Sequence, residues 1–302
     1  MIRYIKDEKW KNFIKDFKRN PEKWYKDQIE NDWEFDEETQ LKIIEECFYD
    51  KNYEYSIKFI KNPKEQVCLK AIKQDRLALE YIKNPTEKIC WEAIKQDGRA
   101  IKYIENPTEE MCLEAVKKNG SAIKYINNPT EQMYFEAVKQ KGFVIEYIDN
   151  PTEEICLTAV KNYGRSIKYI KNPSKEVCLE AIKQDSSAIE FINNPTEEMC
   201  LKAVKQKGYS IKYISKKNQS FDIVQAFFNY YLNKTGDYNY KESYYKYLNK
   251  RFITKDQALI MIQDDPENIN LVSRKIQKEL VKIKPELENY LNKEESINDF
   301  FE

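Results

Sequence analysis

Residues 106–127 read NPTEEMCLEAVKKNGSAIKYIN, and this 22-residue pattern decides the fold because it recurs without a gap. The dipeptide Asn-Pro opens seven such units, at Asn62, Asn84, Asn106, Asn128, Asn150, Asn172 and Asn194. Counted from that Asn, position 10 is Ala in every unit, position 12 is Lys and position 21 is Ile. Five of the six glycines in the chain stand at position 15. A fixed period of this length is typical of stacked-repeat proteins.

Each unit is predicted to form two short helices. Asn-Pro-Thr-Glu fits an N-cap followed by three helical positions, with Glu completing a capping box. The first helix is expected to reach about position 14, where Gly at position 15 ends it in a left-handed conformation. A second helix of about seven residues follows. Isolated helices this short are marginal in water, so stacking must stabilise them. The sequence therefore predicts an all-α fold, an α-solenoid of helix-turn-helix repeats with irregular helical caps.

The segments on either side of the seven units are predicted to be helical caps. Residues 1–61 form an N-terminal cap in which Tyr55–Ile60 matches the second helix of a unit. Residues 62–215 hold the seven repeats, and residues 216–302 form a C-terminal cap with divergent repeats. There, Thr254–Val272 aligns with positions 3 to 21, and Pro285–Leu291 repeats that ending. Residues 219–250 are expected to form two helices joined around residues 234–237.

Composition excludes several classes of protein. The 302 residues include 51 basic and 51 acidic side chains, so the protein has no overall positive field. The chain has no histidine, so the commonest general base and metal ligand is absent. Phosphate-binding and hydrolase motifs are missing from the sequence. We expect no enzyme, no cofactor and no metal site. No apolar run is long enough to span a membrane, and the N-terminus, MIRYIKDEKWKNF, has no signal-peptide pattern.

The segments CLEAVKKNGSAIKYI (112–126) and CLKAVKQKGYSIKYI (200–214) resemble a family of short helical-hairpin repeats of unknown function. Such repeats are abundant in mimivirus-like giant DNA viruses and occur in some bacteria. The resemblance covers about residues 55 to 215. It implies an α-solenoid and a viral protein, and it carries no catalytic residues over to this chain.

Six of the seven cysteines occupy position 7: Cys68, Cys90, Cys112, Cys156, Cys178 and Cys200. Stacked helices lie about 8–10 Å apart, whereas a disulfide needs Cα atoms about 4.4–6.8 Å apart. Equivalent cysteines in adjacent units therefore cannot pair, and no CxxC motif supplies metal ligands. We expect buried, reduced thiols in the core, which fit an intracellular protein.

Position 20 carries a row of tyrosines, which the helical pattern places at the border of the apolar face: Tyr81, Tyr103, Tyr125, Tyr147, Tyr169 and Tyr213. One interpretation is structural, with each ring sealing the groove between neighbouring repeats. The other is functional, with the row anchoring a partner, because tyrosine is enriched at binding hot spots.

Position 12 carries a row of lysines at the edge between the apolar face and solvent: Lys73, Lys95, Lys117, Lys139, Lys161, Lys183 and Lys205. A Glu at position 9 can pair with this Lys three residues later, so a solvated helix face explains the row. The alternative is a ladder that tracks the phosphates of a nucleic acid or another polyanion. Residues 62–215 hold 24 basic and 22 acidic residues, which gives that alternative little support.

Positions 14 and 16 vary most between units, and both flank the turn between the two helices. Position 16 supplies the candidate contacts Arg99, Phe143, Arg165 and Tyr209. Solenoids place variable side chains where partners are recognised, although unconstrained surface positions vary as well. The sequence thus favours a non-enzymatic scaffold that binds a protein partner, with nucleic-acid or polyanion binding, or an architectural role in a viral particle, as alternatives.

Overall fold

The computed structural model describes residues 2–3, 7–47, 56–233 and 242–291. They belong to two compact units, residues 1–148 and 149–302. In each unit α-helices alternate with short 3-10 helices, so the predicted all-α solenoid is confirmed. The described strands are one parallel pair, β1 (Ile2–Arg3) and β2 (Glu34–Phe35), in the segment expected to be wholly helical.

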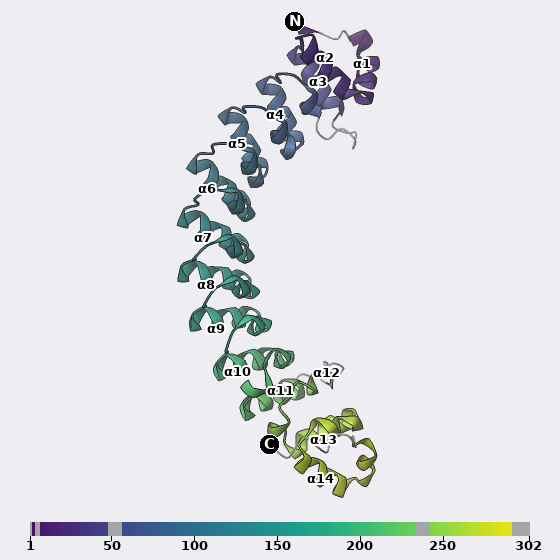
Figure 1. The fold of residues 1–302 in the computed structure, drawn as a ribbon, viewed down its shortest axis with the longest axis vertical. Coiled ribbons are helices and arrows are strands. Elements are labelled where there is room, and N and C mark those ends of the chain that lie inside the picture. Colours follow the sequence, from purple (N-terminus) through teal and green to yellow (C-terminus); the bar gives the residue numbers. More distant parts are fainter. Residues whose placement is uncertain (1, 4–6, 48–55, 234–241, 292–302) are drawn as a thin grey trace. The chain divides into compact units, whose positions relative to one another are not determined.

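Each 22-residue repeat is a ten-residue α-helix followed by a six-residue 3-10 helix (Figure 1). Within each unit, the α-helices of consecutive repeats contact one another, and so do their 3-10 helices. The first unit contains α4 (Glu65–Gln74), η2 (Arg76–Tyr81), α5 (Glu87–Gln96), η3 (Gly98–Tyr103), α6 (Glu109–Lys118), η4 (Gly120–Tyr125), α7 (Glu131–Gln140) and η5 (Gly142–Tyr147). The second contains α8 (Glu153–Asn162), η6 (Gly164–Tyr169), α9 (Lys175–Gln184), η7 (Ser186–Phe191), α10 (Glu197–Gln206) and η8 (Gly208–Tyr213).

The second element of the repeat is a 3-10 helix because its hydrogen bonds close over three residues. The backbone N–H at position 17 donates to the carbonyl at position 14, as in Ala122 to Asn119 at 2.8 Å. The N–H at position 21 donates to the carbonyl at position 18, as in Ile126 to Ile123 at 3.2 Å. This element is close in length to the helix of seven residues that was expected, but it is a 3-10 helix rather than an α-helix.

In six of the seven repeats the residue that caps the α-helix is the Thr or Ser at position 3, so the predicted Asn cap is wrong; in the first repeat Lys64 stands there and its side chain makes no cap. The side-chain oxygens of Thr86, Thr108, Thr130, Thr152, Ser174 and Thr196 accept the backbone N–H of position 6 at 3.1–3.4 Å. The Asn two residues earlier forms the turn before the helix instead. Six of the seven repeat asparagines have φ between 49° and 54°, a left-handed conformation that Asn tolerates better than most residues.

The glycine at position 15 does not end the helix in a left-handed turn, which corrects the second prediction about the repeat. The helix ends in an extended residue at position 14, such as Asn119 with φ of −153°. Glycine is needed because the next repeat lies too close. A Cβ atom on Gly120 would lie 2.8 Å from the Ala137 carbonyl oxygen, and one on Gly164 would lie 2.6 Å from that of Ala181. At Gly98 the overlap with the Ala115 carbonyl would be greater still.

The core of the repeats lies between the α-helical and 3-10 rows. Positions 6, 10 and 11 of the α-helix and positions 17 and 18 of the 3-10 helix are buried in every repeat. All seven cysteines are buried, as expected for the position-7 row. Burial raises the pKa of the thiols of Cys68 and Cys200 to about 11 and raises that of Cys90, Cys112, Cys156 and Cys178 as well.

The N-terminal cap consists of α1 (Asp7–Arg19), α2 (Pro21–Glu30) and α3 (Glu37–Cys47), and η1 (Ser56–Phe59) leads into the repeats. Its core is a cluster of aromatic rings, mostly in tilted or edge contacts, from Trp10, Phe13, Phe17, Trp24, Trp33 and Phe35. The buried Gln28 joins α2 to the end of the cap, directly before the first repeat. Its amide donates to the Phe59 carbonyl at 2.9 Å and accepts the Lys61 N–H at 3.1 Å.

The C-terminal segment contains further pairs of an α-helix and a 3-10 helix. After η9 (Lys216–Asn218), α11 (Phe221–Asn233) packs on α10, and α12 (Glu242–Tyr245) and η11 (Lys250–Phe252) follow. Thr254 caps α13 (Lys255–Asp264), and η12 (Pro266–Leu271) occupies positions 15 to 20. The helix α14 (Arg274–Ile283) and η13 (Pro285–Tyr290) form one more such pair. The expected junction at residues 234–237, like Tyr55, lies outside the described residues.

We expect Gly98→Ala to lower the free energy of unfolding by about 1–3 kcal/mol, because the new methyl group must displace the Ala115 backbone. The matched control is Ser186→Ala, which stands at the same repeat position, where a Cβ atom is already accommodated. The Ser186 hydroxyl is buried without a hydrogen-bond partner, so its removal should leave stability unchanged or slightly raised. Urea and thermal denaturation measure both. Equal midpoints for Gly98→Ala and the unmodified protein would contradict the close approach.

Asn128→Ala should destabilise the first unit by about 1–2 kcal/mol, because alanine tolerates a left-handed φ poorly. Asn128→Gly should have a much smaller effect, since glycine adopts this conformation without a steric penalty. The neighbouring Asn127 is not left-handed, and Asn127→Ala is the control in the same loop. Circular dichroism melting curves compare the three variants, and equal effects at the two asparagines would exclude a backbone origin.

Candidate functional site

In each of the two units, the variable residues of the repeat gather on one surface, which we call the 3-10 face of that unit. It is made by positions 14, 16, 19 and 20 of each repeat. Positions 16 and 19 lie one 3-10 turn apart and therefore point the same way. In the first unit it comprises Asp75, Leu77, Glu80, Tyr81, Asp97, Arg99, Lys102, Tyr103, Asn119, Ser121, Lys124, Tyr125, Lys141, Phe143, Glu146 and Tyr147. In the second it comprises Tyr163, Arg165, Lys168, Tyr169, Asp185, Ser187, Glu190, Phe191, Lys207, Tyr209, Lys212 and Tyr213.

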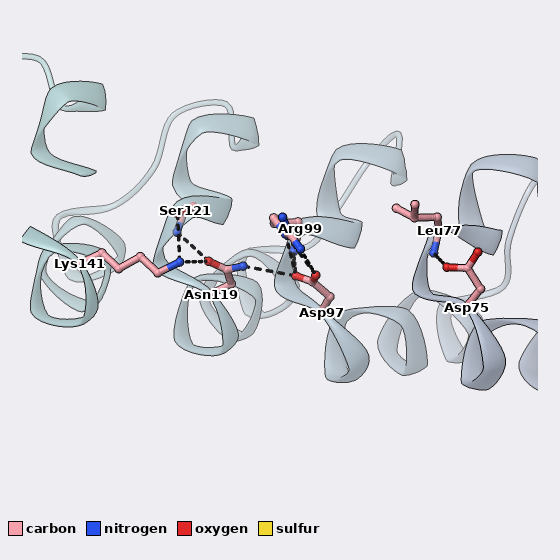
Figure 2. A network of polar contacts seen from close by, with 7 residues as sticks. All are labelled: Asp75, Leu77, Asp97, Arg99, Asn119, Ser121 and Lys141. Atoms are coloured by element: carbon pink, nitrogen blue, oxygen red, sulfur yellow. Dashed lines mark hydrogen bonds and ion pairs between the residues drawn. The ribbon is translucent and has the colours of Figure 1, made fainter. Parts of the chain in front are cut away.

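Position 14 has a structural role wherever it is Asp or Asn. Its side-chain oxygen accepts the backbone N–H of position 16 and so caps the 3-10 helix (Figure 2). The distances are 2.8 Å from Asp75 to Leu77, 2.9 Å from Asp97 to Arg99 and 3.2 Å from Asn119 to Ser121. Asp185 caps η7 in the same way. Lys141, Tyr163 and Lys207 make no such cap, so these positions are released for other contacts.

A polar network connects three successive repeats of the first unit (Figure 2). The Asp97 carboxylate forms an ion pair with Arg99 at 2.8 Å and accepts the Asn119 amide at 3.4 Å. The Lys141 ammonium in turn donates to Asn119 Oδ1 at 3.1 Å and to Ser121 Oγ at 3.4 Å. The variable positions therefore contact one another along the face, and Arg99 is held by its own repeat.

The charge of Arg99 controls the ionisation of Asp97. Burial alone would raise the pKa of Asp97, whose side chain is 12% exposed. The hydrogen bonds and charge of Arg99, with help from Asn119, overcome that penalty and lower the pKa to about 2. Because the folded pKa lies below the ordinary value of 3.8, the ionised carboxylate stabilises the folded state above about pH 4, and this contribution is lost as the pH falls toward 2.

The tyrosine row lies where the sequence placed it, at the border of the core. Five of its six members are half-buried, and Tyr147 is 43% exposed. Lysines at position 19 lie over the rings of the same 3-10 helix, with the Nζ atom 4.2 Å from the ring centre in Tyr103, 4.8 Å in Tyr125, 4.4 Å in Tyr169 and 4.7 Å in Tyr213. Sequence reasoning missed these lysines, although Lys-Tyr pairs at 102–103, 124–125, 168–169 and 212–213 were visible.

The four candidates at position 16 differ in what they contact. Arg99 pairs with Asp97, and Arg165 donates to Ser187 at 2.9 Å while its guanidinium lies 4.8 Å from the centre of the Phe191 ring. Tyr209 packs near Tyr244, with ring centres 6.5 Å apart. Phe143 is 41% exposed. The arginines are therefore engaged within their units, whereas Phe143 offers an apolar surface to solvent.

The position-12 lysines are all exposed and lie in the α-helices rather than in the 3-10 helices. Lys183 pairs with Glu180 at 3.1 Å, the spacing expected for a solvated helix face. Lys95 lies in a shallow depression together with Trp91, Glu65, Glu87 and Glu92. Acidic neighbours of this kind weaken the attraction of the lysine row for a polyanion.

A depression of about 730 Å³ opens beside the first repeats, between α2, η1, η2 and the two Asn-Pro loops. Its walls include Tyr25, Ile29 and Tyr81, and four lysines line it. Two of these, Lys61 and Lys64, form ion pairs with Asp32 and Glu34. Their charges are therefore balanced before any ligand enters.

Neither metal-binding clusters nor membrane spans occur in the described part of the chain. Among residues 2–3, 7–47, 56–233 and 242–291, no three Cys, Asp or Glu side chains converge as metal ligands would. Within the same ranges, every helix is too short or too polar to cross a bilayer.

Comparison with known families finds a match within the repeats. Residues 108–152, 152–196 and 174–219 match the family model described as Domain of unknown function (DUF4116). Each match begins at the Thr or Ser that caps an α-helix and covers two repeats. The repeats are therefore similar to a repeat family of unknown function. No curated protein and no solved structure matches the chain.

We expect Asp97→Asn to destabilise the first unit by about 1–2 kcal/mol at pH 7, because the amide keeps the cap and loses the charge that pairs with Arg99. The difference from the unmodified protein should shrink between pH 4 and pH 2 and vanish below that range. Asp75→Asn is the matched control, since Asp75 caps its 3-10 helix beside Leu77 rather than an arginine. Urea denaturation at a series of pH values measures both, and a pH-independent difference would exclude the ion pair as its cause.

Proposed function

We propose that this protein is a non-enzymatic repeat scaffold that binds a protein partner along the 3-10 face. One observation carries the proposal: positions 14 and 16 change from repeat to repeat on a surface formed by contacting 3-10 helices, while the buried positions stay nearly constant. Repeat proteins recognise partners through variable side chains on an invariant frame. Phe143 and Tyr147, both more than 40% exposed on η5, supply aromatic surface of the kind that anchors partners.

A scaffold rather than an enzyme is supported by how the acidic groups are used. Among the described residues, the carboxyl groups with lowered pKa values are Asp32, Asp97 and Glu198, and each is held by a hydrogen bond from Lys61, Arg99 or Lys175, respectively. Each of these ion pairs joins two residues of the repeat and cap framework. Such pairs lower carboxyl pKa values without any catalytic task.

The setting we propose is the interior of a cell, with reduced thiols, since the position-7 cysteines serve as buried core residues. The likeness of the repeats to those of giant DNA viruses and some bacteria supports a viral protein. An architectural part of a viral particle is the alternative form of the same scaffold role.

A polyanion ladder along the position-12 lysines is the alternative from a different class of function. It requires a surface with a clear excess of positive charge. Glutamates at positions 4, 5 and 9 lie on the same α-helices as these lysines, and Lys95 and Lys183 have them as neighbours. The 3-10 face is therefore the better supported binding surface.

The proposal predicts that Phe143→Ser combined with Tyr209→Ser reduces capture of the natural partner at least fivefold. Serine occupies position 16 in two other repeats, Ser121 and Ser187, so the fold should tolerate both changes. The control is Lys117→Ser combined with Lys183→Ser in the position-12 row, which should retain the partner. Affinity capture from the native cell followed by quantitative mass spectrometry compares them. Retention by both variants, or loss only in the lysine variant, would contradict binding at the 3-10 face.

Titration with single-stranded RNA and DNA at about 50 and 200 mM salt distinguishes polyanion binding from protein binding. Polyanion binding through several lysines falls steeply over that range. Binding at low salt that is lost in the lysine variant would favour the polyanion ladder over the scaffold.

A further inference from the structure

The 3-10 face of the first unit carries a short basic patch, which comprises Arg99, Lys102, Lys124 and Lys141 on three successive repeats. Lys102 and Lys124 are exposed, and Arg99 has 46% of its side chain exposed. The one acidic group among them, Asp97, is already paired with Arg99. Glu80 and Glu146 occupy position 19 on either side, so the patch is bounded by negative charge.

The two lysines at the centre of the patch are held in place without being neutralised. Each lies over a tyrosine ring, Lys102 over Tyr103 and Lys124 over Tyr125. Within the described residues neither forms an ion pair with a carboxylate. A cation held by an aromatic ring keeps its charge and loses less rotamer freedom when a ligand binds, so the pair is preorganised for an anionic group.

An exposed apolar surface adjoins one end of the patch. Phe143 follows Lys141 by two residues, and Tyr147 stands on the same 3-10 helix, η5. Their exposed fractions, 41% and 43%, are among the largest of the apolar residues in the first unit. A ligand that covers both features needs negative charge followed by a bulky apolar group.

We infer that the patch binds an acidic stretch of a partner protein that is flanked by a bulky apolar side chain. The inference rests on the proposed scaffold function and names the chemistry of its partner. Neighbouring repeats lie about 8–10 Å apart and an extended chain advances about 3.3 Å per residue, so three repeats accommodate roughly six residues. A nucleic acid fits less well, because its regularly spaced phosphates would continue past the patch to Glu80 and Glu146.

The probe is a fluorescein-labelled peptide of sequence Leu-Gly-(Glu)4-Gly-Leu, titrated with the full chain by fluorescence anisotropy at about 50 mM salt. We expect saturable binding that weakens at least tenfold in Lys102→Glu combined with Lys124→Glu. The fold should tolerate these changes because glutamate occupies position 19 in three other repeats, at Glu80, Glu146 and Glu190. Phe143→Ser should weaken binding about threefold, and circular dichroism melting curves verify that each variant is folded.

The matched control is Lys95→Glu combined with Lys117→Glu, which reverses the same number of charges in the same two repeats on the α-helices. It should change binding less than twofold. Equal weakening by the two double variants, absence of binding by the unmodified protein, or tighter binding of a 12-nucleotide oligouridine with the same dependence on Lys102 and Lys124 would each overturn the inference. If the natural partner still depends on Phe143 and Tyr209 while the peptide does not bind, the scaffold function stands and only the partner chemistry is wrong.

Discussion

The close approach of one repeat to the next, between positions 15 and 10, is the constraint on which the rest of the structure depends. Gly98, Gly120 and Gly164 lie so near the carbonyl of the following alanine that no side chain fits between. The backbone N–H groups of Gly120 and Gly164 also have a partner there, a glutamine at position 13 of the next repeat. The Gly120 N–H donates to Gln140 at 2.9 Å, and the Gly164 N–H donates to Gln184 at 2.6 Å. Steric fit and a satisfied buried N–H thus fix the same stacking distance.

This constraint joins two positions that lie far apart in the sequence. At Gly98, Gly120 and Gly164 the neighbour is the Ala at position 10 of the next repeat. The alanine is kept after Arg76 and Ser186 at position 15, and Gly208 lies against Tyr230 and Tyr231 instead, so the two residues do not change strictly together. In the C-terminal segment both differ: Pro266 stands at position 15, and Leu280 stands at position 10 of the next pair. Positions 16 and 19 are not among the nearest neighbours of these glycines, so their side chains can vary without disturbing the stack.

The fold was predictable from sequence because a 22-residue period with buried positions leaves little choice of architecture. The local geometry of the repeat was less predictable. Asn and Thr both cap helices well, and only the observed φ near 50° shows that Asn128 serves the turn and Thr130 serves the cap. Gly at position 15 satisfied the pattern of a helix stop, yet its cause is a neighbour 17 residues later, as in Gly120 and Ala137. A contact across repeats leaves no local signature.

Prediction of the candidate site from the sequence was limited in the same way. The Lys at position 12 is constant and therefore forms a visible row in the sequence. Position 19 varies between Lys and Glu, so no such row is visible there. Its significance depends on the ring beside it and on the following repeat: Lys58 lies 4.6 Å from the Phe59 ring and 6.0 Å from the Tyr81 ring of the next repeat. A charge that changes sign between repeats while the ring beneath it stays aromatic agrees with the proposed binding surface, because the frame is preserved while the charge varies.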